Sequence, residues 1–352
     1  MNRWPLYQVT QPDELFSSWL IRNALAHGCT PLSFAGALWP GLRVWITDID
    51  CCVTTAFLQR FGAPLLADLT SLTLRFQTVL KRLSEPGLRR GNVRWILSQG
   101  HRNRWCRCGL QFCPLCFAEN VPYFRYQWRL AWHTSCPIHG IRLVSRCSEC
   151  HAPVQPHLLA PPAVDCRRCH ECDGLLSKCE VQPCSLSALK LQHLADAKMR
   201  TYCGAEGWFE YAYLLISLLR YSMRNRSQST LGMLRALDVD FETEGVISSG
   251  LPLELLEVNE RTKLLAYLQQ ILSHPVQQVI RTVSDYRVPV SVFGGPSRRP
   301  GSGALPMSLI SAAVTRRPRR APQVIQRRPA DQNDVERKWL RLQRKILSYE
   351  GA

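Results

Sequence analysis

The sequence predicts a mainly α-helical protein with small cysteine-rich modules in its middle. Amphipathic stretches with the period of helices occupy much of residues 14–83 and 188–286. Between them, residues 106–184 are rich in Cys, Pro and Arg and show little periodicity. We therefore expect five parts in order: an N-terminal helical domain resembling a helix-turn-helix (HTH-like) over residues 1–105, a central metal-binding region over 106–184, a C-terminal helical domain over 185–290, a basic flexible arm over 291–330 and a last helix over 331–352.

Size and composition bound the class of protein. With 352 residues, of which 46% are hydrophobic, the chain can form two modest domains with real cores, which excludes a disordered, collagenous or coiled-coil protein. The longest apolar stretch, residues 211–219, is far shorter than the roughly 18 residues that span a bilayer. The start, Met1–Pro5, lacks the apolar core of a signal peptide, so we expect a cytoplasmic protein without membrane contact. In such a reducing compartment, 16 Cys favour metal binding over disulfides.

The first hundred residues predict paired helices. Gly28 ends the first of them, and Thr30 followed by Pro31 makes a good N-cap and first position for the second. Two helices joined by a short Gly-containing turn are compatible with an HTH, and equally with an ordinary helical hairpin in a small bundle. The four helices are expected over residues 14–27, 31–38, 54–61 and 65–83.

The C-terminal part predicts helices with apolar faces. Five are expected, over residues 188–199, 208–220, 229–237, 259–272 and 276–286. In the fourth, Leu264, Leu265, Leu268, Ile271 and Leu272 form a face that we assign to the core. A last helix over residues 331–349 carries an apolar stripe at helical spacing: Val335, Trp339, Leu342 and Ile346.

Paired cysteines with a two-residue spacer are the most informative motif. A two-residue spacer lets both side chains of a pair bind one tetrahedral ion from a tight knuckle, and two knuckles complete a closed site of the zinc-ribbon type. Such a site leaves no position for water, so it stabilises structure and does no chemistry. We therefore predict two structural zinc ions, with 19 and 18 residues between the pairs. The expected ligands are Cys113, Cys116, Cys136 and His139 for one ion, and Cys147, Cys150, Cys169 and Cys172 for the other.

Other cysteines leave alternatives open. Cys166 and Cys169 also form a pair with a two-residue spacer, so Cys166 could replace Cys172; we prefer Cys172 because residues 173–176 resemble the turn after a ribbon's last knuckle. Three residues lie close enough to compete with the first pair: His101, Cys106 and Cys108. The isolated cysteines fit small buried apolar residues better: Cys29, Cys51, Cys52, Cys179, Cys184 and Cys203. His151 and His170 are expected at the surface.

Positive charge suggests a polyanionic partner. The chain has 44 Lys+Arg against 27 Asp+Glu, a net charge of +17, and residues 296–352 contribute +9 of it. Clustered arginines can contact a phosphate backbone, although a solvated surface is the plainer interpretation. In residues 120–132, arginines alternate with aromatics; there we assign Trp128 and Trp132 to the core. The candidate contacts to nucleic acid or a partner are Arg89, Arg90, Arg94, Arg125, Arg129, Arg316, Arg317, Arg319 and Arg320.

Catalytic motifs are missing. The sequence has no phosphate-binding P-loop, no His-Glu-x-x-His and no Gly-x-Ser-x-Gly. Asp48 and Asp50 are a conceivable pair for the magnesium of a nuclease or transposase, but no further carboxylate accompanies them. We assign this pair a structural or turn role, and we expect no enzyme activity.

In order along the chain, the motifs resemble the zinc-bearing core of the TniQ family, which includes TnsD-like target selectors of bacterial transposons. The resemblance covers residues 4–176 and continues weakly through 251–286 and 331–343. The residues that carry it are Gln111–Cys116, Pro122–Arg125, Trp128–Trp132, Cys136–Gly140, Leu143 and Cys147–Cys150, together with Glu14–Leu20, Trp39–Gly41, Trp45 and Asp48–Asp50.

This resemblance implies an adaptor. TniQ-type proteins pair target recognition with recruitment of an AAA+ ATPase (TnsC- or TniB-like), which licenses the transposase. Some members recognise a DNA site themselves, whereas others ride on a CRISPR guide-RNA Cascade complex, commonly as a homodimer. The family's ligands carry over onto the eight residues named above, and the protein would associate with the bacterial nucleoid when in complex. The alternative is a zinc-dependent, sequence-specific DNA-binding transcription regulator.

Overall fold

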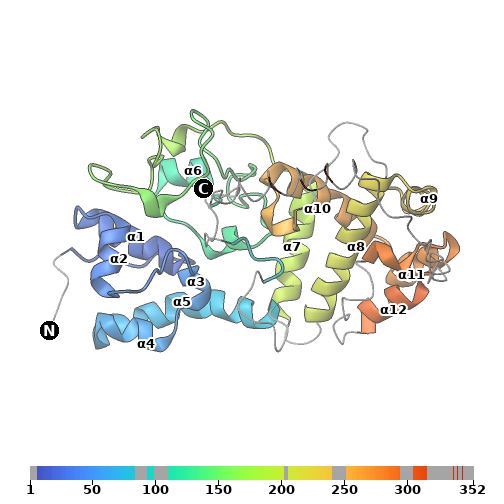
Figure 1. Cartoon of the computed structure of the whole chain (residues 1–352), viewed down its shortest axis with the longest axis horizontal. Helices are drawn as coiled ribbons and strands as arrows, with labels where there is room; N and C mark the ends of the chain where they lie inside the picture. Colours follow the sequence, from blue (N-terminus) through green and yellow to red (C-terminus); the bar gives the residue numbers. More distant parts are fainter. Residues whose placement is uncertain are drawn as a thin grey trace. The chain divides into compact units, whose positions relative to one another are not determined.

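The computed structural model describes residues 6–83, 93–98, 110–201, 205–239, 251–293 and 304–314, with residues 336, 339 and 343. In these residues the secondary structure is helical, and the extended segments form only isolated β-bridges and no sheet (Figure 1). This confirms the predicted fold class. The chain forms two compact units, residues 1–314 and residues 315–352. No helix in the described residues is long and apolar enough to cross a membrane.

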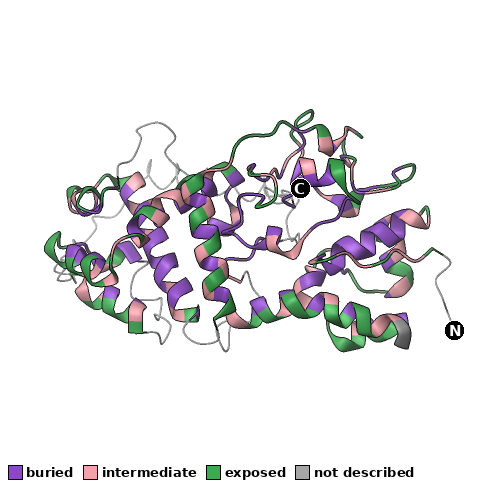
Figure 2. Ribbon diagram, turned by 180° about the vertical axis from the view of Figure 1, so that it is seen from behind, coloured by how far each residue is buried: buried purple, intermediate pink, exposed green. Residues whose placement is uncertain are grey.

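The N-terminal helices agree with the predicted ones, with one addition. They are α1 (Phe16–Ala26), α2 (Pro31–Leu38), α3 (Ile49–Cys52), α4 (Thr55–Leu58), the 3-10 turn η1 (Gln59–Phe61) and α5 (Ala63–Leu83). The short α3 was not predicted. α1 is buried along almost its whole length (Figure 2), because α2, α3 and α5 all contact it. Edge-to-face aromatic contacts fill the space between α1 and the helices around it, and these involve Phe16, Trp19, Trp39 and Phe61.

Thr30 caps α2 as predicted, since its hydroxyl accepts a hydrogen bond from the Ser33 backbone N–H at 3.1 Å. Replacing Thr30 with alanine leaves this N–H without its protein partner. We expect Thr30→Ala to lower the free energy of unfolding by about 1 kcal/mol, measured by urea denaturation. Thr30→Ser keeps the cap and should retain wild-type stability. Equal losses in both variants would show that the hydroxyl does not act as a cap.

The central region consists of loops and short turns around buried aromatic side chains. Its helical pieces are α6 (Pro114–Glu119), η2 (Tyr126–Arg129), η3 (Pro156–Leu158) and η4 (Leu176–Lys178). Trp128 and Trp132 are 3% and 0% exposed, which confirms that both belong to the core. Their surroundings are continuous with the apolar residues of the C-terminal helices, so residues of the central region and of these helices share one core.

The C-terminal helices include α10, whose apolar face is buried. They are α7 (Leu186–Arg200), α8 (Ala205–Asn225), α9 (Gln228–Arg235), η5 (Leu253–Leu255), α10 (Val258–Leu272), α11 (Val276–Asp285), η6 (Val290–Phe293) and α12 (Ala304–Ala312). α10 lies against α7 and α8, and Leu264, Leu265, Leu268 and Ile271 are fully buried between them. The predicted core face is therefore confirmed for these four residues, whereas Leu272, its fifth member, is half-buried.

Buried polar contacts join the central region to these helices. The Arg261 guanidinium on α10 donates to the Ala131 carbonyl at 3.1 Å and to Gln111 Oε1 at 2.8 Å. On α7, the Asp196 carboxylate accepts from Trp132 Nε1 at 2.9 Å and lies 2.8 Å from His133 Nε2. Because Arg261, Gln111, Trp132 and His133 are buried and Asp196 is half-buried, the contacts fix the relative position of segments far apart in sequence.

One predicted boundary is wrong. Residues 291–330 were expected to form a flexible arm, but the structure places α12 within them. α12 contacts α8 and α11, and its Leu309 is fully buried. The Val314 backbone N–H donates to the Val288 carbonyl at 2.9 Å, so residues 304–314 are held against the C-terminal helices. Apolar burial thus overrides the Pro- and Gly-rich composition here.

The rest of the predicted arm, residues 315–330, lies outside the described residues, as do residues 331–335. Within the last predicted helix, Glu336, Trp339 and Gln343 are helical and exposed.

Candidate metal centres

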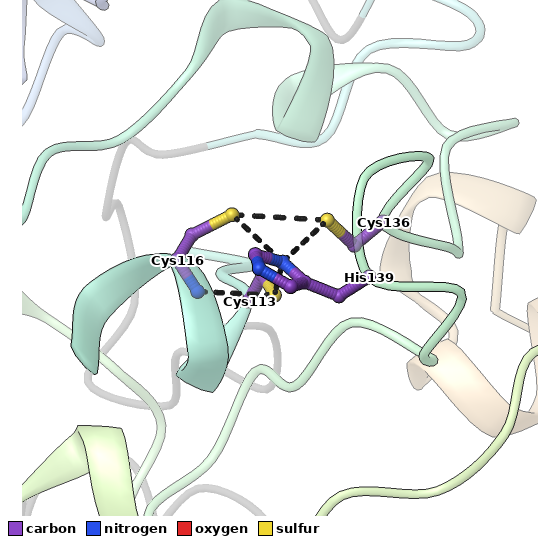
Figure 3. Close-up of side chains that lie close together, drawn as sticks. All are labelled: Cys113, Cys116, Cys136 and His139. Atoms are coloured by element: carbon purple, nitrogen blue, oxygen red, sulfur yellow. Dashed lines mark hydrogen bonds between the residues drawn. The ribbon is translucent and has the colours of Figure 1, made fainter. Parts of the chain in front are cut away.

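The first cluster consists of Cys113, Cys116, Cys136 and His139. Cys113 is the N-cap of α6, where its sulfur accepts from the Cys116 backbone N–H at 3.4 Å and Pro114 begins the helix. One turn of helix therefore places Cys116 beside Cys113. Cys136 and His139 come from a tight turn closed by the Gly140 N–H on the Cys136 carbonyl, with Gly140 in the left-handed region. Figure 3 shows the four side chains converging from these two elements.

The donor atoms of the first cluster fit a tetrahedral ion. His139 Nδ1 lies 3.3, 3.4 and 3.5 Å from the sulfurs of Cys113, Cys116 and Cys136, and the Cys116 and Cys136 sulfurs are 3.7 Å apart. A tetrahedral ion about 2.3 Å from sulfur and about 2.0 Å from nitrogen would separate two sulfurs by about 3.8 Å and sulfur from nitrogen by about 3.5 Å. The side chains are thus arranged as they would be around a metal ion.

Surrounding residues orient the histidine and shield the sulfurs. His139 Nε2 lies 2.9 Å from Glu119 Oε2 at the end of α6, which leaves Nδ1 to face the sulfurs. The three cysteines are 0%, 5% and 1% exposed, and Phe112 and Phe117 are fully buried in the same core. The first cluster is therefore largely closed to solvent.

The second cluster consists of Cys147, Cys150, Cys169 and Cys172, whose sulfurs all lie within 4.8 Å of one another. Both halves repeat the turn seen at Cys136. The N–H of the fourth residue after the first cysteine donates to that cysteine's carbonyl, and this fourth residue is left-handed: His151 in one half and Asp173 in the other. Unlike the first cluster, this one has two exposed cysteines, Cys150 and Cys172.

The structure distinguishes between Cys166 and Cys172, the two alternative ligands of the second cluster. Cys166 is fully buried away from the cluster, where burial raises the pKa of its thiol, whereas Cys172 lies with the other three sulfurs. Among the isolated cysteines Cys179 is buried, and Cys29, Cys51, Cys52 and Cys184 are half-buried. His151 is exposed as expected and His170 is half-buried. The described residues do not include His101, Cys106, Cys108 or Cys203.

Two of the candidate arginines, Arg125 and Arg94, are partly exposed and lie on aromatic rings. The guanidinium carbon of Arg125 is 4.9 Å from the ring centre of Tyr123 and 5.9 Å from that of Trp128. That of Arg94 is 5.0 Å from the ring centre of Tyr213. For both side chains, a role in binding stays a prediction. Six further candidates fall outside the described residues: Arg89, Arg90, Arg316, Arg317, Arg319 and Arg320.

Arg129 was wrongly assigned to a nucleic-acid or partner surface. Its side chain is 1% exposed, with Nη2 2.5 Å from Asp48 Oδ2 and Nη1 3.1 Å from Asp50 Oδ2. Its Nε donates to the Leu97 carbonyl at 2.8 Å. A guanidinium enclosed in this way cannot reach a phosphate. The partners come from a segment some 80 residues earlier, and no local signal in the sequence reveals them.

The two aspartates have the structural role expected of them. Asp50 is fully buried and accepts hydrogen bonds from the Ser17 backbone N–H at 2.8 Å and the Ser17 hydroxyl at 2.6 Å. Burial raises the pKa of Asp50 to about 6, and the facing Arg129 opposes this rise. Both carboxylates are directed at Arg129, and they do not form an open magnesium site.

The described residues hold two four-donor clusters and no further cluster of Cys, His, Asp or Glu suited to a metal. These features define a helical protein whose centre is built around two candidate metal sites.

A comparison with protein families identifies the domain. The model of the TniQ family matches residues 5–143, so these residues form a TniQ domain, and the resemblance seen in the sequence is confirmed over this range. The matched range includes the whole first cluster, and the second cluster follows it. TniQ is a family of non-catalytic transposon adaptors, and the match implies a role in transposition-associated target selection. No curated protein matches the sequence.

Proposed function

We propose that this protein is a target-selection adaptor for transposition, which links a target-recognition complex or target DNA to an AAA+ regulator. The observation that carries the proposal is the TniQ match over residues 5–143. The two clusters support it, because closed four-donor sites offer no position for a substrate or a reacting water. The target-recognition complex would be a Cascade-type guide-RNA complex, and the regulator a TnsC- or TniB-like ATPase.

Both clusters are proposed to hold structural zinc. Thiolates with at most one imidazole, arranged tetrahedrally, form the donor set that zinc prefers in structural sites. The ion would supply binding energy to the fold and no chemistry. Three thiolates and His139 would hold the first ion, and four thiolates the second.

The zinc-held region would act as a rigid connector. Arg167 donates from Nε to the Phe117 carbonyl at 2.9 Å and from Nη2 to the Asn120 carbonyl at 2.8 Å, which joins the second cluster to α6. Arg146, next to Cys147, lies 2.7 Å from Glu257, the N-cap of α10. An adaptor must hold two binding surfaces in a fixed relation, and these contacts tie the clusters to the C-terminal helices.

The composition of α2 favours target recognition through a partner complex. α1 and α2 are joined by a short turn in which Gly28 is left-handed, as in an HTH. Residues 31–38, however, contain no charged, Asn or Gln side chain, whereas base edges are read chiefly by Arg, Lys, Asn and Gln. The exposed Leu32 suits a protein surface better than a DNA groove.

The adaptor proposal is tested by affinity purification of the full chain from its native host. We expect an AAA+ ATPase among the bound proteins, and a guide-RNA complex or target DNA with it. A mock purification from the untagged strain is the control. Recovery of the protein alone on one discrete DNA site, without an ATPase, would support a transcription regulator and overturn the proposal.

Glu119 is expected to strengthen zinc binding at the first cluster. Because its carboxylate orients His139, Glu119→Gln should weaken the affinity for zinc by about tenfold, the lower end of such effects, since Glu119 is exposed. Competition against a chelator of known affinity measures this. Glu180→Gln changes an exposed glutamate outside both clusters and serves as the matched control. Equal affinities in the two variants would contradict the prediction.

A further inference from the structure

The two clusters differ in their access to solvent. In the first, the cysteines are almost completely buried. In the second, Cys147 and Cys169 are 2% and 3% exposed, whereas Cys150 and Cys172 are exposed. A reagent in solution can therefore reach two sulfurs of the second cluster without any opening of the fold.

The clusters also differ in charge. A doubly charged metal with three thiolates and a neutral imidazole has a net charge of about −1, and with four thiolates about −2. One carboxylate lies near each cluster, Glu149 3.9 Å from the Cys172 sulfur and Glu119 2.9 Å from His139 Nε2, so the difference in charge comes from the ligands themselves. More electron-rich thiolates react faster with electrophiles, so charge and exposure both make the second cluster the more reactive one.

Each exposed sulfur has a buried partner within reach. The sulfurs of Cys147 and Cys172 are 3.7 Å apart, and so are those of Cys150 and Cys169. An exposed thiolate that is oxidised thus lies beside a second thiolate that can resolve it. Such an adjacent resolving cysteine is typical of redox-sensitive thiols.

We propose that the second cluster is an oxidation site, at which a peroxide forms a disulfide and releases the metal while the first cluster stays intact. The exposed Cys172 or Cys150 thiolate attacks the O–O bond of hydrogen peroxide, forms a sulfenic acid and releases hydroxide. The neighbouring thiolate then attacks the sulfenic sulfur, forms the disulfide and expels a second hydroxide. Two thiolates are oxidised, one peroxide is reduced to two hydroxide ions, and the metal leaves because two of its four donors are gone.

Oxidation would act on the contacts that the second cluster supports. Arg146, directly before Cys147, and Arg167, two residues before Cys169, reach the N-cap of α10 and helix α6, respectively. Loss of the metal would release these two arginines from their fixed positions. The site would thereby make the connector between the TniQ domain and the C-terminal helices sensitive to peroxide. The inference rests on the proposed function, because it requires metal in both clusters.

The test uses the full chain loaded with zinc. Metal analysis first establishes two equivalents per chain; fewer than two would refute the zinc assignment of the proposed function, separately from this inference. Hydrogen peroxide is then added with a chromogenic zinc chelator, and the released zinc is followed in time. Differential alkylation and mass spectrometry identify the oxidised cysteines.

We expect one equivalent of zinc to be released at least about tenfold faster than the other, because attack on the buried cluster must wait for local opening. Disulfides should join Cys147 to Cys172 or Cys150 to Cys169, while Cys113, Cys116 and Cys136 remain reduced. Simultaneous loss of both ions, or earlier loss from the first cluster, would overturn the proposal.

Two variants sharpen the test. Cys172→His keeps four donors but removes one exposed thiolate, so release should slow and the only disulfide should join Cys150 to Cys169. Release at an unchanged rate without that disulfide would overturn the proposal. Cys184→Ser removes a half-buried thiol outside both clusters and should leave release unchanged. An effect of this substitution as large as that of Cys172→His would count equally against the proposed site.

Discussion

Replacing Cys116 with alanine is expected to remove one equivalent of metal and to unfold the central region. Its sulfur lies 3.4 Å from His139 Nδ1 and 3.7 Å from the Cys136 sulfur, inside the first cluster. Structural zinc contributes about 10–16 kcal/mol to folding in small zinc domains, which is as large as the whole stability of a typical protein. The loss of one of four donors therefore cannot be absorbed. Metal analysis, the thermal midpoint and limited proteolysis of residues 110–143 measure the effect.

Cys166→Ala is the matched control for this variant. The same atoms are removed from a fully buried position outside both clusters. A small cavity is the only expected cost, about 1–2 kcal/mol, and both equivalents of metal should remain. A Cys116→Ala protein that kept its metal and its thermal midpoint would show that the ligand assignment is wrong. Loss of metal from Cys166→Ala would contradict the preference for Cys172.

Arg129→Met is expected to destabilise the fold by about 3–5 kcal/mol, because it leaves two carboxylates without their cation in the interior. The Asp50 side chain is fully buried and that of Asp48 is 13% exposed, and both face the Arg129 guanidinium. Methionine keeps most of the apolar stem and removes the charge. Urea denaturation at neutral pH measures the loss. Arg125→Met, at a half-buried arginine that lies on aromatic rings, should cost about 1 kcal/mol or less.

The pH dependence of the Arg129→Met defect follows from the charges. The pKa of Asp50 is already raised by burial to about 6, above its unfolded value, so the folded protein takes up a proton as the pH falls through this range. Removing Arg129 takes away the group that opposes this rise, and protonation then neutralises the unpaired carboxylate. The variant should therefore regain part of its lost stability between pH 7 and pH 5. A defect that grew on acidification, or one no larger than that of Arg125→Met, would contradict the assigned role.

Local signals account for what could be predicted. Thr30 and Pro31 start α2 because the cap and the fixed proline dihedral act within a few residues. The knuckles are equally local, since each half of a cluster is a turn of a few residues closed by its own backbone hydrogen bonds. The apolar face of α10 was predicted correctly because its period matches that of a helix.

Features that depend on distant segments were missed. α12 contains no charged residue but stands among arginines, prolines and glycines, and its burial comes from α8 and α11. Arg129 stands among aromatic and basic residues in a pattern typical of nucleic-acid contacts, yet its partners are Asp48 and Asp50. No short-range pattern distinguishes a solvated arginine from one that a remote carboxylate neutralises.

The sequence by itself determined the helical fold class, the paired cysteine knuckles and the resemblance to TniQ, because caps, periods and two-residue spacers act over a few positions. Only the tertiary structure decided that Cys172 lies in the second cluster and Cys166 outside it, that Arg129 is buried, and that one cluster is closed while the other is exposed. Burial and ion pairing are properties of surfaces brought together from distant parts of the chain, and the free energy that governs them depends on this environment rather than on neighbouring residues.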